Sequence, residues 1–354
     1  MNDISKRKAD HLDLAEKGDV GFKHTTTLFE CVRLVHDALP ELAFDELDTR
    51  CQLLGKTLRA PILIAAMTGG HERAERINRE LAGIAEQRGL AFGLGSQRAM
   101  HRDRAKAKSY MVRDVAPTAL LLGNLGVVQA ASMSTAEVAE LVQTVGADAL
   151  CIHLNPAMEL VQAEGDRDFR RGLATLERLH SELAVPVVAK ETGCGLSSRA
   201  AQRLRSAGIR HVDVSGAGGT SWVAVETHRA TDARKELGKA FWDWGIPTAA
   251  SVALVAREGF ESIFATGGVK SGLDIAKAVA LGASAGGIAR PMLQALESGG
   301  TAGALAFIEQ IETEIRTAML LTGSPTLAAL RNAPRVILGE LADWLRQEPN
   351  QASG

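Results

Sequence analysis

"PILIAAMTGG", residues 61–70, joins a short, continuously apolar run to a polar end that contains two glycines. Continuous apolar runs predict strands that are covered on both faces, as in parallel sheets. Seven further runs of this kind follow, each succeeded by a stretch of helical composition: "LAFGLG" (90–95), "ALLLGN" (119–124), "DALCIH" (148–153), "PVVAKE" (186–191), "RHVDVSG" (210–216), "SIFATGG" (262–268) and "AGGIA" (285–289). The sequence therefore predicts eight successive strand–helix units.

Eight such units in 354 residues predict an α/β fold, a TIM (β/α)8 barrel over residues 61–345. An open, doubly wound parallel sheet is the lesser alternative. Residues 1–60 precede the first unit and are expected to be an N-terminal extension of the same domain. Within them, "FDELDTRCQLLGKTLRAP" (44–61) predicts two strands around a glycine turn that cap the barrel floor.

The stretch between the sixth and seventh predicted strands is about fifty residues long and holds three of the four tryptophans among many charges. A long ordered loop over the barrel mouth is expected there, with residues 222–244 at its centre. Pro247 then precedes an apolar pattern of helical period. It predicts the start of the sixth barrel helix.

Bulk composition excludes several classes of protein. No apolar run approaches the roughly 18 residues of a membrane span, although 46% of the residues are apolar. A formal charge of −2 gives no large basic field for nucleic acid, so a small-molecule partner is expected. The four cysteines lack the spacing of a zinc site, and residues 1–19 are too polar for a secretory signal. We therefore expect a cytoplasmic protein with reduced thiols that binds neither membrane nor nucleic acid.

Polar residues and glycines follow the predicted strands. In a TIM barrel the carboxyl ends of the strands form the active site, so these residues are expected to face one cavity. In chain order they are Met67, Thr68, Gly69, Ser96, Gln97, Arg98, Asn124, His153, Asn155, Glu159, Lys190, Glu191, Ser215, Thr220, Gly267, Gly268, Gly286 and Gly287.

The glycine pairs after the seventh strand and in the eighth predict a phosphate site, because glycine lets backbone N–H groups approach an anion. The alternative for the first pair is a tight loop before a helix. A second anion site is suggested by basic residues in "RKADHL", and the alternative is a solvated charge run. Its members would be Arg7, Lys8 and His11, joined by Arg98.

Lys190 ends an otherwise apolar strand. Its ammonium group therefore either emerges into the barrel mouth, where it suits an electron-poor ring or a phosphate, or forms a buried ion pair with Glu191 or Asp213.

Nine motifs taken together resemble the type 2, FMN-dependent isopentenyl-diphosphate delta-isomerases. In chain order they are "RKADHL", "AAMTGG", "GLGSQR", "GNLG", "HLNP" followed by Glu, "KETGCG", "DVSGAGGTSW", "WGIPT" and "GGVKSG". The resemblance runs from Arg7 to about Leu293. It implies a TIM barrel that uses reduced FMN and Mg²⁺ to interconvert isopentenyl diphosphate and dimethylallyl diphosphate without net oxidation, with NADPH as the flavin reductant. It also implies a homo-oligomer, a tetramer or an octamer.

The resemblance assigns roles to the matching positions. FMN would be held by Met67, Thr68, Gly69, Ser96, Asn124, Lys190, Ser215, Thr220, Gly267, Gly268, Gly286 and Gly287. The substrate diphosphate would be met by Arg7, Lys8, His11, Arg98, His153 and Asn155, with Met158 beside it. Glu159 would bind a Mg²⁺ ion that bridges to the diphosphate, since carboxylate and phosphate oxygens are its preferred ligands.

Met158 departs from the family pattern. The resemblance places a Gln before the metal-binding Glu, as a substrate contact and a proposed proton-transfer partner, whereas a thioether is a weak acceptor with no proton to donate. Three outcomes remain open. The flavin is the only acid and base, another residue such as Gln97 or Glu191 stands in, or the chain is a divergent paralogue that acts on another prenyl or phosphorylated ligand.

Two rival functions use the same fold. An FMN-dependent oxidoreductase acting on a 2-hydroxy acid needs a His base followed by an Arg after a late strand. The chain has "DVSGAGGTS" (213–221) at that place, with neither residue. A non-catalytic FMN-binding protein is favoured only by Met158.

Overall fold

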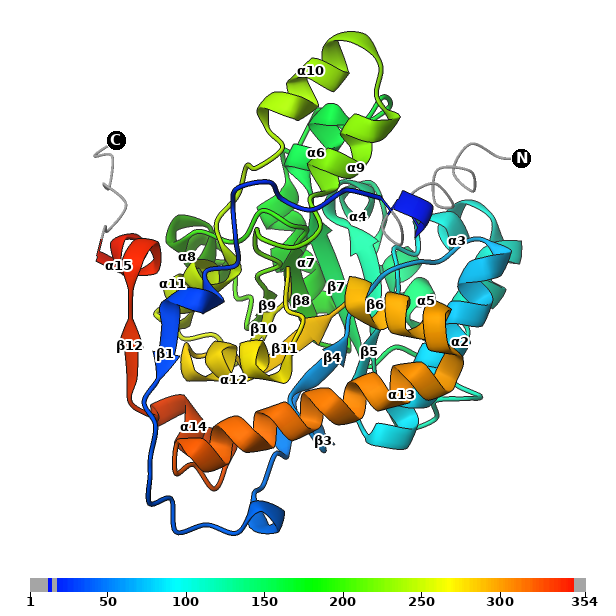
Figure 1. Ribbon diagram of the computed structural model, residues 1–354. Coiled ribbons are helices and arrows are strands. Elements are labelled where there is room, and N and C mark those ends of the chain that lie inside the picture. The colour runs from blue at the N-terminus through cyan, green and yellow to red at the C-terminus, as the bar shows by residue number, and fades with distance from the viewer. Residues whose placement is uncertain (1–11, 15–17, 347–354) are drawn as a thin grey trace.

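Eight parallel strands close into a barrel in the computed structural model, which describes residues 12–14 and 18–346 (Figure 1). The predicted TIM barrel is therefore confirmed, and the open sheet is wrong. Around the barrel the strands follow one another in the order β4 to β11, with β11 hydrogen-bonded to β4. They are β4 (Ile62–Ile64), β5 (Ala91–Gly93), β6 (Leu120–Gly126), β7 (Ala149–Leu154), β8 (Val187–Glu191), β9 (His211–Asp213), β10 (Ser262–Ala265) and β11 (Ala285–Ile288).

Helices surround the barrel, and local sequence fixes their ends. The side chain of His71 accepts the N–H of Ala74 at the start of α2, and Gly89 ends that helix with a φ of 65°. Pro247 directly precedes α11, as predicted. The helices are α2 (Glu72–Arg88), α3 (Arg98–Arg102), α4 (Val127–Ala131), α5 (Thr135–Val145), α6 (Pro156–Val161), α7 (Gly172–Glu182), α8 (Ser198–Ser206), α9 (Trp222–Arg229), α10 (Asp232–Ala240), α11 (Thr248–Ala256), α12 (Gly272–Ala280), α13 (Arg290–Leu321), α14 (Leu327–Asn332) and α15 (Gly339–Arg346).

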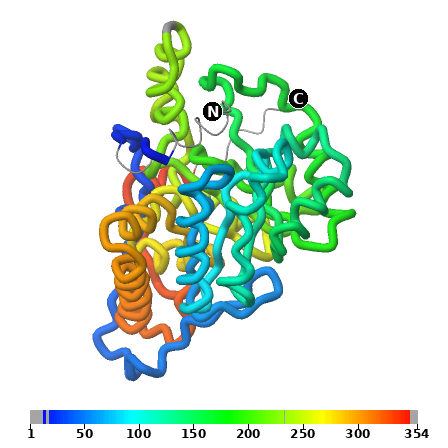
Figure 2. Tube along the Cα trace, turned by 90° about the vertical axis from the view of Figure 1, so that its right-hand side faces the viewer, coloured from blue at the N-terminus to red at the C-terminus, as the bar shows by residue number. Residues whose placement is uncertain are grey.

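A hairpin lies at the end of the barrel opposite α10 (Figures 1 and 2). Its strands β2 (Cys51–Leu53) and β3 (Lys56–Leu58) pair antiparallel, which agrees with the strand–turn–strand expected from the sequence. Leu53 and Leu58 pack into one cluster with side chains from the barrel interior. The hairpin therefore covers the amino-terminal ends of the barrel strands.

The segment after β9 differs from the expected long loop. It contains two helices, α9 and α10, which project above the barrel mouth (Figures 1 and 2). The Ser221 side chain caps α9 by accepting the N–H of Ala224, and apolar residues of α9 are buried against Val20 and Trp242. The predicted place over the barrel mouth is confirmed, but the helices were missed because they are held by contacts with distant parts of the chain, which the local sequence does not reveal.

Residues 18–27 run across the barrel mouth between the glycine-rich loop after β9 and the segment that follows α10. The Val20 carbonyl accepts the N–H of Ser221 (2.8 Å), and the Gly21 carbonyl accepts Nε1 of Trp242 (2.9 Å). The backbone N–H of Lys23 donates to Asp243 (2.6 Å). The N-terminal segment is thereby held against the mouth.

The remaining elements lie outside the barrel. Strands β1 (Val32–Leu34) and β12 (Arg335–Ile337) pair antiparallel, and the short 3-10 helices are η1 (Phe29–Cys31), η2 (Phe44–Glu46) and η3 (Arg104–Tyr110). Within the described part of the chain, no helix combines the length and the apolarity needed to cross a membrane.

Candidate functional site

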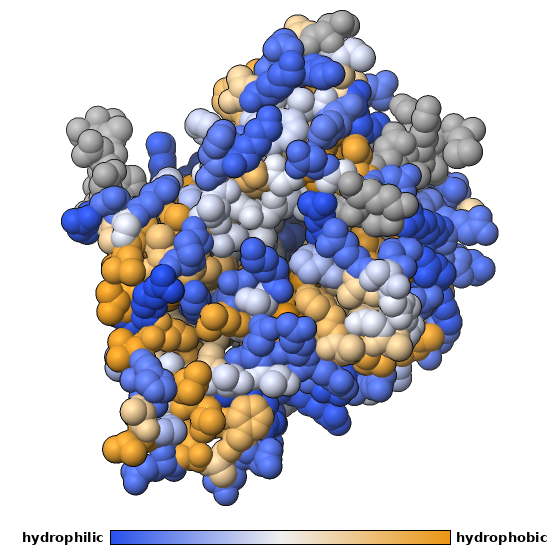
Figure 3. Space-filling model, viewed as in Figure 1, coloured by the Kyte–Doolittle hydropathy of each residue, from blue (hydrophilic) through white to orange (hydrophobic). Residues whose placement is uncertain are grey.

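A cavity of about 780 Å³ opens at the carboxyl ends of the barrel strands. Its volume lies in the range of small-molecule sites. Figure 3 shows the hollow on the face below α10. Residues that follow each of the eight strands line it. The predicted site residues that line it are Met67, Thr68, Gly69, Ser96, Arg98, Asn124, His153, Asn155, Met158, Glu159, Lys190, Ser215, Thr220, Gly267, Gly268 and Gly287.

Some predicted residues do not reach this cavity. Gly286 is a buried residue of β11, and a Cβ added to it would lie 2.5 Å from the Ile275 side chain of α12. It therefore serves close helix–strand packing and does not line the cavity. Arg7, Lys8 and His11 lie outside the described residues, although Leu12, which follows His11, lines the cavity.

The two residues named as stand-ins in one of the three alternatives for Met158 also lie elsewhere. Gln97 is fully buried, and its amide donates to the Leu141 carbonyl (2.9 Å) and accepts the N–H of Asn124 (2.9 Å). Glu191 accepts the N–H groups of Cys194 and Gly195, and burial raises the pKa of its carboxyl to about 8. Both hold loops in place outside the cavity, so neither stands in for a glutamine at position 158.

Gly69 is required by the packing of the first loop. A Cβ added there would lie 2.1 Å from Cε1 of the Tyr110 ring. The Tyr110 hydroxyl donates to the Ser96 carbonyl (2.7 Å), which joins the loops after β4 and β5. Burial raises the pKa of Tyr110 far above its ordinary value, so the phenol stays protonated and remains a donor.

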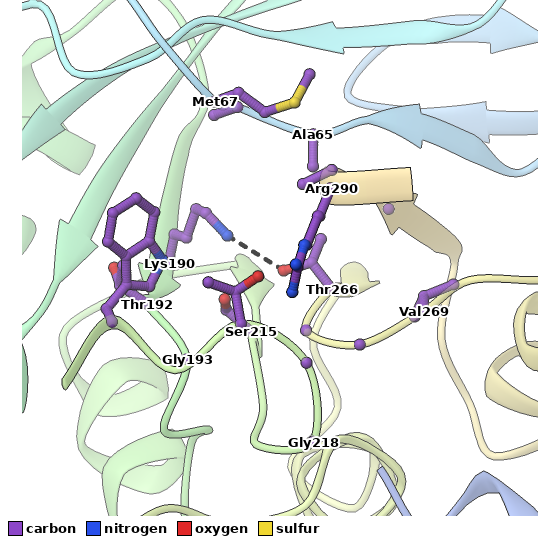
Figure 4. A pocket seen from close by; sticks show the side chains of 18 of the residues that line it. Ala65, Met67, Lys190, Thr192, Gly193, Ser215, Gly218, Thr266, Val269 and Arg290 are labelled. Carbon is purple, nitrogen blue, oxygen red and sulfur yellow. Dashed lines mark hydrogen bonds between the residues drawn. The ribbon is translucent and has the colours of Figure 1, made fainter. Parts of the chain in front are cut away.

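Lys190 forms a buried polar network and also faces the cavity (Figure 4). Its Nζ lies 2.6 Å from Oδ2 of Asp213 and donates to the Thr266 hydroxyl (3.2 Å), which in turn donates to Oδ1 of Asp213 (2.6 Å). The Asp213 side chain is 3% exposed. Lys190 therefore forms a buried ion pair with Asp213 and also emerges into the barrel mouth, which were the two alternatives from the sequence. Both are possible because an ammonium group has three N–H donors and these contacts use two.

The loops after β9 and β10 pack closely because both contain glycines. Gly267 and Gly268 have φ values of 94° and 74°. A Cβ on Gly268 would meet Thr27 at 2.5 Å, and one on Gly219 would meet the Gly268 backbone at 2.3 Å. Their bare backbone lines the cavity close to the start of α12.

Arg290 is a site residue that sequence reasoning missed. It begins α13 directly after the eighth strand, and its side chain points across the cavity (Figure 4). The guanidinium donates to the Gly18 carbonyl (2.8 Å), whereas its Nε is buried without a hydrogen-bond partner among the residues described. A basic residue immediately after the last barrel strand was the signal that could have found it.

Helix α6 presents one stripe of residues to the cavity. Asn155, Met158 and Glu159 are spaced by three and four positions, which places them on one face. The Asn155 amide donates to Oε1 of Glu159 (2.9 Å) and lies 3.8 Å from the Met158 sulfur. Oε2 of Glu159 accepts the N–H of Asp166 (2.9 Å). Next to this stripe, Nδ1 of His153 is hydrogen-bonded to Asn124 (2.8 Å).

Metal ligands in this cavity are few. No group of three or more His, Cys, Asp and Glu side chains could hold an ion in residues 12–14 and 18–346. A cation at Glu159 would therefore need most of its ligands from a bound molecule or from water.

Comparisons of the sequence with known proteins identify its family. The family described as FMN-dependent dehydrogenase matches residues 1–154 and 129–336. An isopentenyl-diphosphate delta-isomerase of Methanothermobacter thermautotrophicus is 44% identical over 97% of the chain and 96% of its own length. Enzymes of the same name from Halobacterium salinarum (43% identity, 96% of both chains) and Synechococcus sp. (46% identity, 93% of this chain and 95% of the other) are similarly close.

Solved structures agree on the fold alone. A mandelate oxidase with an FMN adduct aligns with a TM-score of 0.65 at 18% identity, over 92% of this chain and 95% of its own. A lactate oxidase of Pediococcus acidilactici aligns with a TM-score of 0.66 at 15% identity, over 95% and 94%. The near-complete matches to sequences above 40% identity decide the relationship: the chain belongs to the FMN-dependent dehydrogenase family and, within it, to the isopentenyl-diphosphate delta-isomerases.

Proposed function

We propose that this protein interconverts isopentenyl diphosphate and dimethylallyl diphosphate, using reduced FMN and Mg²⁺. The observation that carries the proposal is the cavity itself, which gathers polar groups suited to a flavin and a stripe of α6 suited to a diphosphate. The family membership supports the same reaction. One proton is added at an alkene carbon and another is removed from an allylic carbon, so the reaction is redox-neutral.

The cavity residues fit FMN. Thr192 Oγ1 and Arg290 Nε both line the cavity and are buried without a partner among the residues described, so a bound molecule can satisfy them. We place the FMN phosphate at Gly267, Gly268 and Gly287, with Arg290 as a cationic partner. Met67, Thr68, Gly69, Ser96, Asn124, Ser215 and Thr220 complete the proposed flavin site, and Lys190 offers its third donor to the ring.

The α6 stripe fits a magnesium diphosphate. A carboxylate has about four lone-pair positions, and Glu159 uses two of them in hydrogen bonds, so it can still bind a cation. Mg²⁺ in proteins is often held by one or two carboxylates together with substrate phosphates. We propose that Arg98, His153 and Asn155 bind the diphosphate. Residues 1–60 would contribute Arg7, Lys8 and His11 from a segment whose Leu12 already lines the cavity.

When bound, reduced FMN supplies an electron-rich ring that stabilises positive charge on the hydrocarbon and can exchange a proton, and NADPH serves only to reduce it. The protein holds the diphosphate through α6, orients the hydrocarbon and excludes water that would trap a cation. Met158 contributes apolar surface and carries no exchangeable proton. The described residues therefore leave proton transfer to groups other than residue 158.

Incubation of the protein with isopentenyl diphosphate, FMN, Mg²⁺ and NADPH tests the proposed function. We expect dimethylallyl diphosphate to form without stoichiometric loss of NADPH. Steady consumption of NADPH would instead identify an oxidoreductase. Bound yellow flavin without turnover would identify a binding protein or a paralogue with another substrate.

Replacing Met158 with Gln tests how much the departure from the family pattern limits catalysis. The two side chains have similar length, and the amide would restore a donor and an acceptor beside Asn155. We expect the isomerisation rate to rise about tenfold, the effect of one added hydrogen bond in the transition state. Initial rates measured against Met111→Gln, an exposed control on the surface, check this result. An unchanged rate would mean that residue 158 does not limit catalysis.

We also propose that the protein is a cytoplasmic homo-oligomer, a tetramer or an octamer. The support is a set of exposed apolar side chains near β1, β12 and η2, where apolar surface gathers at the lower left of Figure 3: Val35, Leu39, Phe44, Val336 and Leu338. Four free cysteines suit a reducing compartment.

A further inference from the structure

Gln162 is a cavity residue to which neither the sequence motifs nor the proposed mechanism gives a role. It follows α6 directly, and its backbone N–H donates to the Met158 carbonyl (3.0 Å), which closes the last turn of the helix. It lies four positions after Met158 and three after Glu159, so its side chain continues the stripe that faces the cavity.

The amide of Gln162 is buried but unsatisfied. The residue is 4% exposed, and its Nε2 has no hydrogen-bond partner within residues 12–14 and 18–346. The other cavity-lining glutamine, Gln129, donates its Nε2 to Asp166 (2.8 Å). A buried amide without a partner destabilises the free protein, so its presence in a cavity wall points to a ligand.

The chemistry of that ligand follows from the neighbours of Gln162. An amide N–H needs an oxygen acceptor, and the hydrocarbon part of a prenyl substrate has none. Glu159, on the same face, only accepts hydrogen bonds when ionised, so an anion bound there needs donors from nearby residues. Met158, on the same face of α6, supplies no donor.

We propose that Gln162 binds the substrate, donating a hydrogen bond from its amide to an oxygen of the diphosphate held at Glu159. This inference rests on the proposed function. Gln162 thereby supplies the amide contact on the α6 stripe that Met158 cannot make. The contact is a binding contact, because an amide does not ionise near neutral pH and relays no proton.

The test compares Gln162→Met with the wild-type holoenzyme. Methionine keeps the length and apolar volume of the side chain but removes the amide. We expect the KM for isopentenyl diphosphate and the dissociation constant of inorganic diphosphate with Mg²⁺, measured by calorimetry on the FMN-loaded protein, both to rise about tenfold or more. FMN affinity should not change. The thermal midpoint of the ligand-free protein should stay constant or rise by about 1–2 °C, because a buried unsatisfied group has been removed.

A second variant and a control sharpen the test. Gln162→Glu should weaken diphosphate binding further at pH 8, because a carboxylate repels the ligand and Glu159, and should recover as the pH falls and the carboxyl becomes a donor. Gln143→Met, on the exposed face of α5, should change neither constant.

Three results would overturn the inference: unchanged diphosphate binding in Gln162→Met, a loss of FMN affinity in its place, or a fall of several degrees in the midpoint. Failure of the proposed function has a different signature. In that case the wild-type holoenzyme binds magnesium diphosphate without isomerising isopentenyl diphosphate, and the calorimetric comparison still decides the role of Gln162.

Discussion

Lys190→Met is expected to lower the free energy of unfolding by about 3–5 kcal/mol, because it leaves the buried Asp213 carboxylate without its cation. The same change removes the ammonium donor from the cavity wall, so the protein should also release FMN. Denaturant unfolding measures the first effect, and flavin absorbance after gel filtration measures the second.

Two further variants show whether these effects come from the buried pair. Lys239→Met removes an exposed ion pair with Glu236 (2.7 Å) and should change stability by less than about 1 kcal/mol. Adding Asp213→Asn to Lys190→Met removes the unpaired charge and should recover part of the stability without restoring flavin. Equal stability of Lys190→Met and the wild type would show that Asp213 does not depend on this lysine.

Glu159→Gln is expected to reduce Mg²⁺-dependent isomerisation by about 1000-fold while the protein stays folded and keeps FMN. A metal ion contributes several kcal/mol of charge stabilisation, and an amide is a poor ligand for it. The fold should tolerate the change, because a glutamine oxygen can still accept the N–H of Asp166 while Asn155 turns its amide to accept from the new NH₂ group.

Initial rates over a range of Mg²⁺ concentrations check this prediction. Glu164→Gln is the matched control, since Glu164 follows the same helix but is exposed and does not line the cavity. Full activity in Glu159→Gln, with an unchanged Mg²⁺ requirement, would contradict the metal assignment.

The barrel and most of its rim could be predicted because their signals are local. Most strands lie in continuous apolar runs, and barrel closure brings the polar residues at the strand ends to one mouth. Gly286 marks the limit of this reasoning. Gly286 and Gly287 are adjacent in β11, yet only Gly287 lines the cavity, a difference that the apolar pattern of the strand does not reveal.

Other parts of the site depend on contacts between distant segments. Helices α9 and α10 have few local signals beyond the cap at Ser221, and α9 packs on Val20 from the N-terminal segment. Gln162 lies beyond the last residue of a recognised motif, and only the structure shows that its amide faces the cavity unsatisfied. Such features follow from tertiary packing, which sequence periodicity does not encode.

The N-terminal segment across the barrel mouth also sets the order in which the site can be completed during synthesis. Gly21 accepts its hydrogen bond from Trp242, which lies 221 positions later in the chain. Val20 likewise accepts from Ser221, which is also synthesised much later. The ribosome therefore synthesises the first six barrel strands, β4 to β9, before Ser221 or Trp242 exists. Residues 18–27 cannot form these hydrogen bonds until then. A nascent chain cut short before α10 would hold six of the eight barrel strands but lack β10 and β11, which close the barrel, as well as Trp242, which holds the N-terminal segment. Closure of the barrel and completion of its mouth therefore both wait for the last third of the chain.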